Sequence, residues 1–208
     1  MEGTCQWILE DKVFQSWMDE DNSEHPLIWI CDKSGMGKTP LAVFISEHLE
    51  KTKLPKDGNW IMYYFCDRRQ HYRNTAASIL RGFIVQVHKK QRELTTIFRK
   101  ELRIQQSLLL AIPPLWKILR DMMNASPARR IYWIIDGLDQ CDEEAVDHFL
   151  LRLTTDFGLD SQQRDSKIEE TMTTEAGNPS APTNVPSRSP EVRIVILRVT
   201  RSNASQRS

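Results

Sequence analysis

The sequence predicts an α/β fold in which a parallel sheet is covered by helices on both sides. Short apolar runs, typical of strands buried on both faces, alternate along the chain with longer segments whose apolar residues recur at the helical period. The chain has 208 residues, of which 40% are hydrophobic and 27% charged. This length and composition suit one good-sized globular domain with tails.

Four apolar runs are the predicted strands, and they are rich in β-branched and aromatic residues. They lie at 27–31, 60–66, 131–135 and 193–197. Segments with helical periodicity precede and separate them, at 6–20, 40–50, 74–90, 113–124 and 143–153, with a less regular one at 91–111. In the first helix Trp7, Phe14, Trp17 and Met18 are expected on the apolar side, and Asn74 is a candidate N-cap of the third.

A long polar segment separates the last predicted helix from the last strand. Residues 160–190 are rich in Ser, Thr, Pro and charge and almost free of large apolar residues. Such a segment buries too little surface to offset its ordering entropy, so we expect a disordered insertion. The predicted layout is a helical lead-in (1–26), a core (27–159), the insertion (160–190), and a fourth core strand with a tail (191–208).

Charge and hydropathy exclude several classes of function. Lys plus Arg and Asp plus Glu both number 28, so the chain lacks the basic excess of a nucleic-acid-binding surface. The longest apolar stretch, at 108–116, is too short for a membrane span and contains two prolines. No basic N-terminal region suggests a signal peptide, and we expect a cytoplasmic location. The cysteines are predicted to be small buried hydrophobes in a reducing compartment: Cys5, Cys31, Cys66 and Cys141.

A glycine loop between the first strand and the next helix predicts a phosphate site. The stretch LIWICDKSGMGKT runs from an apolar strand through Ser34, Gly35, Met36 and Gly37 to Lys38 and Thr39. Backbone amides at a helix N-terminus hold phosphate oxygens, and glycines let the backbone approach them. In such a P-loop the lysine neutralises the β- and γ-phosphates and the Thr39 hydroxyl is a Mg²⁺ ligand. The implied cofactors are ATP or ADP with Mg²⁺.

A second motif follows the third predicted strand. The run IYWIIDGLDQCDEE places Asp136 at the end of a buried strand, the usual position of an aspartate that holds Mg²⁺ through water. Asp139 is the candidate residue to orient or activate water. The acidic residues that follow most simply favour the N-terminus of the next helix.

Four motifs together resemble the NTPase core of fungal NACHT-type signalling proteins and the nephrocystin 3-like N-terminal domain. They are GTCQWILEDKVFQSW, ICDKSGMGKT, YYFCDRR with RNTAASILRGFIVQ, and IYWIIDGLDQCDE, and the similarity covers about residues 3–157 and 191–201. Gly137 after Asp136 is typical of this family. The resemblance implies a switch ATPase, closed with ADP and oligomeric with ATP, in non-self recognition or cell death.

The resemblance also implies further site residues. A sensor arginine should follow the fourth strand, and Arg201 is preferred over Arg198. Gly3 to Cys5 and Trp7 match positions near the adenine, whereas Arg73 and Arg81 are expected to make structural contacts.

Three residues depart from the family pattern. Asp32 replaces a glycine, and a carboxylate about 6 Å from a phosphate costs on the order of 3 kcal/mol at an effective dielectric near 20, unless its side chain points away. Pro40 removes an amide from the first helical turn, which costs about 1 kcal/mol. Gln140 replaces a glutamate and cannot be a general base. We therefore expect weakened nucleotide binding and slow or absent hydrolysis.

From the resemblance, we expect the sequence to cover the core without the helical and winged-helix clamp modules of the family. A nearly bare core is expected to associate with itself or with related NACHT proteins. Two alternatives remain: a non-catalytic relic or decoy that has lost nucleotide binding, and, less favoured, a small-metabolite kinase. The DGLDQCDE motif does not fit a kinase.

Overall fold

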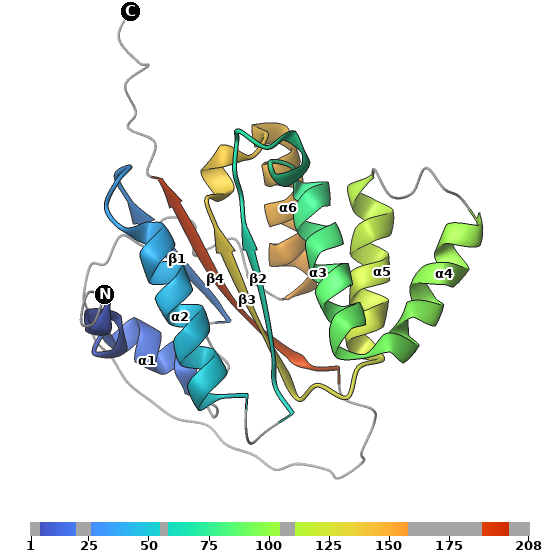
Figure 1. Ribbon diagram of the computed structural model, residues 1–208, viewed down its shortest axis with the longest axis horizontal. Coiled ribbons are helices and arrows are strands. Elements are labelled where there is room, and N and C mark those ends of the chain that lie inside the picture. The colour runs from blue at the N-terminus through green and yellow to red at the C-terminus, as the bar shows by residue number, and fades with distance from the viewer. Residues whose placement is uncertain (1–4, 20–25, 55–57, 105–110, 158–188, 200–208) are drawn as a thin grey trace, which may run out of the picture.

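The computed structural model describes residues 5–19, 26–54, 58–104, 111–157 and 189–199. Its centre is one sheet of four parallel strands in the order β1-β4-β3-β2 (Figure 1). The strands are β1 (Leu27–Asp32), β2 (Trp60–Phe65), β3 (Arg130–Asp136) and β4 (Glu191–Val199). All four predicted strands and the α/β fold class are confirmed. The fold is that of a three-layer P-loop NTPase.

The parallel register brings all the strand ends to one edge of the sheet. Asp32 of β1 pairs with Val199, and Asp136 of β3 pairs with Leu197 of β4 on one side and with Phe65 on the other. Ligands in open parallel sheets bind outside the carboxyl ends of the strands. This edge is therefore where the predicted motif residues meet.

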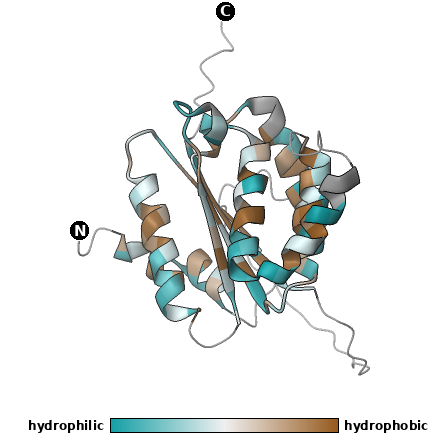
Figure 2. Cartoon of the chain, turned by 45° about the vertical axis from the view of Figure 1, so that its right-hand side comes forward, coloured by the Kyte–Doolittle hydropathy of each residue, from teal (hydrophilic) through white to brown (hydrophobic). Residues whose placement is uncertain are grey.

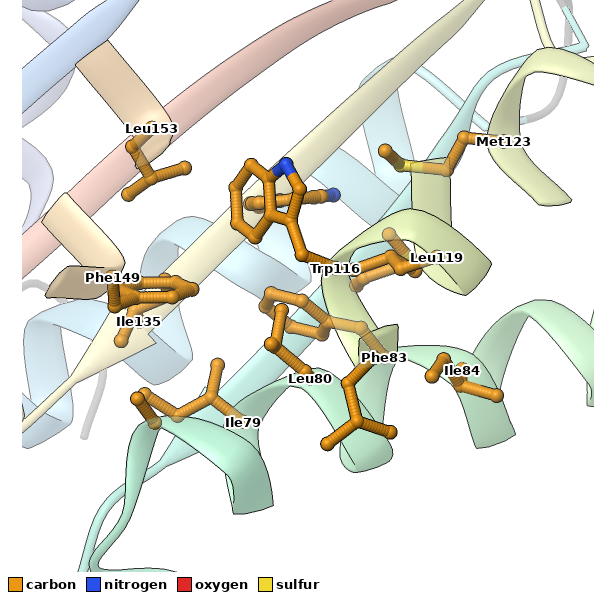
Figure 3. Close-up of a cluster of buried hydrophobic side chains, with 14 of the residues drawn as sticks. Ile79, Leu80, Phe83, Ile84, Trp116, Leu119, Met123, Ile135, Phe149 and Leu153 are labelled. Atoms are coloured by element: carbon orange, nitrogen blue, oxygen red, sulfur yellow. The ribbon is translucent and has the colours of Figure 1, made fainter. Parts of the chain in front are cut away.

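Helices cover both faces of the sheet (Figures 1 and 2). On one face, α1 (Lys12–Met18) and α2 (Lys38–Thr52) pack with Phe14, Trp17, Ile45 and Leu49 against Tyr132 and Ile134. On the other lie α3 (Ala76–Lys90), α5 (Ile112–Asn124) and α6 (Glu143–Asp156), and α4 (Thr95–Ile104) packs beside α5. Their inward residues include Ile79, Phe83, Trp116, Leu119, Phe149 and Leu153 (Figure 3). Every residue of β3 is buried, as expected of a central strand.

The single helix predicted at 6–20 is wrong. A 3₁₀ turn, η1 (Gln6–Leu9), comes first, and α1 begins only at Lys12. The break is at Asp11, whose carboxylate accepts a hydrogen bond from the Phe14 amide at 2.9 Å and so caps a new helix. Phe14 and Trp17 are buried as predicted, but Trp7 precedes the break and is 56% exposed.

The N-cap of α3 is Thr75 rather than Asn74. The Thr75 hydroxyl accepts from the Ser78 amide and the Ser78 hydroxyl accepts from the Thr75 amide, both at 3.1 Å. This reciprocal capping box satisfies two helix-end donors, which a lone asparagine cap does not. The Asn74 carbonyl instead accepts from the Asp142 amide at 3.2 Å and connects α3 to the segment before α6.

The prediction that all four cysteines are buried is confirmed for two of them. Cys66 and Cys141 are buried, but Cys5 is half-buried and Cys31, near the end of edge strand β1, is exposed. Among the described helices, none is both long and apolar enough to cross a membrane.

Candidate functional site

The loop between β1 and α2 has open space beside both of its glycines. Gly35 and Gly37 adopt left-handed conformations with φ of +83° and +79°, and an added Cβ at either position would meet nothing within 4 Å. These glycines are thus required by backbone conformation and not by crowding. Ser34, just before Gly35, and Met36, between the two glycines, are both exposed.

Lys38, the first residue of α2, folds back over this loop. Its Nζ donates hydrogen bonds to the Asp32 carbonyl at 3.0 Å and to the Lys33 carbonyl. The ammonium therefore lies above the loop, beside helix-end amides that have no intrahelical acceptor. A positive charge beside the amides of a helix N-terminus is an arrangement that can hold an anion.

Thr39 and Asp136 meet at the centre of the site. The Thr39 hydroxyl donates to Asp136 Oδ2 at 2.6 Å, although the residues are 97 positions apart in sequence. Asp136 is 5% exposed. Burial raises the pKa of its carboxyl group, and the nearby Asp139 carboxylate adds to this, while hydrogen bonds from Thr39 and the Gly137 amide and the Lys38 charge act in the opposite direction.

This donor set fits a magnesium ion bound together with phosphate. Mg²⁺ takes oxygen ligands and is usually held by one or two carboxylates plus substrate phosphates. The Asp136 carboxylate and Thr39 hydroxyl supply oxygen next to the anion loop. Within the described ranges no group of three His, Cys, Asp or Glu residues is placed to hold a metal ion by itself. The phosphates would therefore complete the coordination.

A 3₁₀ turn, η5 (Leu138–Gln140), follows Asp136. Gly137 precedes it with φ of +71°, and its amide donates to the Leu197 carbonyl at 3.0 Å. A Cβ at Gly137 would lie 3.2 Å from the Cys66 carbonyl and 3.1 Å from the Gln140 Nε2. Conformation and crowding together therefore require glycine here, which explains the Asp-Gly pair in physical terms. Asp139, on the turn, is half-buried.

Comparison with known proteins identifies the family. The family model described as "Nephrocystin 3, N-terminal" matches residues 3–169, more than half of the chain. The chain belongs to the nephrocystin 3 N-terminal family. It is also 30% identical over 139 residues to "Vegetative incompatibility protein HET-E-1" of Podospora anserina, an alignment that covers 65% of the chain and 10% of that protein. No solved structure matched the chain.

The departures from the predicted motif have local structural roles in this family member. The Asp32 carboxylate accepts a hydrogen bond from the Lys33 amide at 2.6 Å, so it is held at the start of the loop. Pro40 lies in the first turn of α2, before Leu41, whose amide bonds to the Gly37 carbonyl at 3.0 Å. Proline is tolerated there because the missing amide has no intrahelical acceptor.

Gln140 is occupied by a structural contact. Its Oε1 accepts from the Arg68 amide at 3.1 Å, and Arg68 Nη2 donates to the Asp139 carbonyl at 3.2 Å. Sequence reasoning missed Arg68. Its position three residues after the end of β2, at the carboxyl edge of the sheet, was the available signal.

Several predicted residues of this nephrocystin 3 N-terminal domain are not at the site. Arg198 lies over the Trp29 ring, 5.0 Å from its centroid, on edge strand β1. Arg201, the preferred sensor, lies outside the described residues. Arg73 makes the structural contact expected of it, 6.0 Å over the Tyr64 ring.

The predicted adenine contacts are described only in part. Gly3 and Thr4 lie outside the described residues, as does most of the insertion at 160–190. Cys5 and Trp7 belong to the turn before α1, with the Trp7 ring exposed. Their contact with adenine stays a prediction.

Proposed function

We propose that this chain is the nucleotide-binding module of a NACHT-type fungal signalling protein and takes ATP or ADP with Mg²⁺. The observation that carries the proposal is the 2.6 Å hydrogen bond between Thr39 and Asp136 beside an open glycine loop. Two remote motifs converge at the carboxyl edge of a parallel sheet, where P-loop chemistry needs them.

Each residue has a distinct task in this proposal. The amides of the loop from Ser34 to Thr39 hold phosphate oxygens, and Lys38 moves from its carbonyl partners to the β- and γ-phosphates. Thr39 is a direct ligand of Mg²⁺, and Asp136 holds it through water. The ion, when bound, neutralises phosphate charge.

Hydrolysis should be weak or absent. An amide side chain cannot accept a proton from water at neutral pH, so Gln140 does not act as a base. Its oxygen is also engaged by the Arg68 amide. Asp139 remains as the candidate that orients water, from a position close enough to raise the pKa of Asp136. The module would then signal through the identity of its bound nucleotide, ATP or ADP.

The biological setting is inferred from the relative. A protein named for vegetative incompatibility supports a role in fungal non-self recognition or cell-death signalling. Because the alignment covers 10% of that protein, the role of the whole protein is part of the proposal. Association with itself or with related NACHT proteins, in the cytoplasm, belongs to the same proposal.

One observation favours a second candidate, a relic that no longer binds nucleotide. The Asp32 carboxylate takes up the Lys33 amide and places negative charge at the start of the anion loop. Such charge opposes phosphate by an amount comparable to the free energy of one good phosphate contact. Binding measurements decide between these candidates.

Calorimetric titration with Mg-ATP and with ADP tests the proposal. We expect micromolar dissociation constants, and Lys38→Ala should weaken binding by on the order of 100-fold because hydrogen bonds to charged groups are lost. Asp32→Gly should tighten binding. If the parent chain is folded by circular dichroism but releases no heat, while Asp32→Gly binds, the relic candidate is correct. If neither chain binds, the site does not take nucleotide.

Replacing Gln140 with glutamate should increase ATP hydrolysis by roughly 100-fold, the usual contribution of a positioned base. The new carboxylate can still accept the Arg68 amide, so the turn should persist. Phosphate release under saturating Mg-ATP measures the rate. Gln140→Met, similar in length but without a base, is the matched control. Equal rates for the glutamate and methionine variants would show that position 140 does not limit hydrolysis.

A further inference from the structure

The outer side of β2 is an edge of the sheet. β2 pairs with β3 on one side, and no strand within the described ranges pairs with its other side. The Cys66 amide, just after β2, donates to the Asp136 carbonyl of β3 at 2.9 Å, so the even-numbered residues of β2 direct their backbone groups toward β3. The odd-numbered residues, Ile61, Tyr63 and Phe65, therefore direct theirs outward.

This edge lacks the usual protection against pairing. An exposed strand edge is a template for another strand, and proteins commonly protect it with charged residues, proline or a bulge. The sequence of β2 is WIMYYF, which has no charge and no proline and is rich in residues favoured in strands. Tyr63, in its middle, is 43% exposed. The net charge of the chain is zero, so no overall charge repulsion keeps two copies apart.

The Gln86 side chain on α3 covers the middle of this edge. Its Oε1 accepts a hydrogen bond from the Tyr63 amide at 3.1 Å, and its Nε2 donates to the Tyr63 carbonyl at 2.9 Å. Two facing residues of an antiparallel ladder exchange the same two bonds when they form a hydrogen-bonded pair. The Gln86 carboxamide therefore takes the place of a residue in an antiparallel strand.

A glycine lets α3 approach β2 closely enough for this contact. Gly82 lies one helical turn before Gln86, and a Cβ added there would be 2.7 Å from the Tyr64 ring. The Gly82 carbonyl also accepts from Gln86 Nε2 at 3.2 Å, which orients the carboxamide. Figure 1 shows α3 beside β2. Both bonds from Gln86 to Tyr63 lie at the surface, where water competes for them, so they are readily exchanged.

We propose that the outer edge of β2 is a surface for antiparallel pairing with β2 of a second copy of this chain, and that Gln86 competes with this pairing. A two-fold axis at Tyr63 makes the edge its own complement, with Tyr63 opposite the partner's Tyr63 and Ile61 opposite the partner's Phe65. The pairing breaks no bond between β2 and β3, because it uses outward backbone groups. Gln86 must release Tyr63 before the strands pair.

The proposal gives a surface to the self-association that is part of the proposed function, and rests on it to that extent. Nucleotide binding has no part in the pairing, since the Lys38 and Thr39 side chains are not on this edge. All measurements are therefore made without nucleotide, and failure of one proposal leaves the other standing.

Gln86→Met tests the competition on the full chain, because methionine has a similar length but makes neither bond. In sedimentation equilibrium across the micromolar range, we expect this variant to dimerise at least about tenfold more tightly than the parent, since neither copy has to give up its two hydrogen bonds. Hydrogen exchange of the Tyr63 amide is the second readout. In Gln86→Met it should be faster than in the parent at low concentration and should slow as concentration rises.

Two further variants locate the effect. Val85→Met adds the same side chain at the neighbouring, 50% exposed position of α3 and should leave dimerisation unchanged. Tyr63→Pro removes an outward amide, which an edge strand tolerates, and should abolish dimerisation in both the parent and Gln86→Met. If Gln86→Met does not fold, comparison of the parent with Tyr63→Pro at high concentration still decides.

Three outcomes would overturn the proposal. Gln86→Met would sediment like the parent, Val85→Met would strengthen dimerisation as much as Gln86→Met does, or the dimers would persist in Tyr63→Pro. The last outcome would place self-association on a different surface.

Discussion

Glu191→Ala is expected to lower the free energy of unfolding by about 3–5 kcal/mol, the usual cost of removing one partner from a buried ionic network. Glu191 bridges two arginines at the amino end of the sheet. Its Oε2 accepts from Arg130 Nη2 at 2.6 Å, and its Oε1 accepts from Arg193 Nε at 2.6 Å. The two arginine side chains are only 8% and 1% exposed. Without Glu191 both positive charges would stay buried but lose the carboxylate that they share.

The network also holds α1 on the sheet. Arg193 Nη1 donates to the Trp17 carbonyl at 3.0 Å and Nη2 to the Asp19 carbonyl at 3.2 Å, at the end of α1. Cationic donors at a helix C-terminus satisfy carbonyls that have no intrahelical partner. Loss of the glutamate should therefore loosen α1 first, and Trp17 with it.

Urea denaturation, followed by tryptophan fluorescence and by circular dichroism, measures this effect. Asp121→Ala is the matched control because it removes a carboxylate from the exposed Lys117–Asp121 pair on α5. Exposed ion pairs four residues apart on a helix contribute only about 0.3–0.5 kcal/mol to the free energy of unfolding. A Glu191→Ala loss as small as that of the control would mean that water solvates the two arginines and that the network does not anchor α1.

The sequence predicts the sheet well because its physical signals are local. The all-apolar runs at 27–31 and 131–135 admit few alternatives to buried strands, and a glycine loop before a helix specifies its own geometry. The meeting of Thr39 and Asp136 follows from parallel strand order, since both follow strand ends at one edge. The need for glycine at position 137 is also local, because the backbone is left-handed there and an added Cβ would be crowded by its neighbours.

The features that the sequence did not predict depend on competition between neighbouring residues of similar type, or on contacts between residues far apart in the chain. Asp11 and Asn74 are both plausible caps by residue type, but only the structure shows that Asp11 splits a helix and that Thr75 outcompetes Asn74. Arg193 has the pattern of an inward strand residue that should be apolar. Its partners at Trp17 and Asp19 lie far away in the chain, so no local pattern could reveal the network.

Asp136→Asn is expected to weaken nucleotide binding while it increases the stability of the fold. Loss of the carboxylate should weaken Mg-nucleotide binding by roughly 10–100-fold, the range for groups that hold a metal through an outer shell. The amide oxygen of the substituted side chain can still accept the Thr39 hydroxyl. At neutral pH the same variant should raise the free energy of unfolding by on the order of 1 kcal/mol, because polar groups arranged for function are commonly destabilising.

The sign of this stability change follows from the pKa of Asp136, which burial raises above its ordinary value. A carboxyl with a raised folded-state pKa favours the folded state while it is protonated. That contribution is fully present below the unfolded-state pKa of about 3.9 and is lost as pH rises through the folded-state pKa. Asparagine does not titrate, so its stability advantage over the parent should be near zero at about pH 3 and should grow with pH through that window.

Urea denaturation of both proteins across this pH range, with calorimetric Mg-ATP titrations at neutral pH, measures the two effects together. Asp142→Asn, on an exposed carboxylate in the same acidic run, is the matched control for a change of net charge. A stability difference that does not depend on pH would mean that ionised Asp136 is not penalised by burial. An unchanged Mg-ATP affinity, with the stability gain present, would mean that the buried carboxylate is strained for a purpose other than holding the metal.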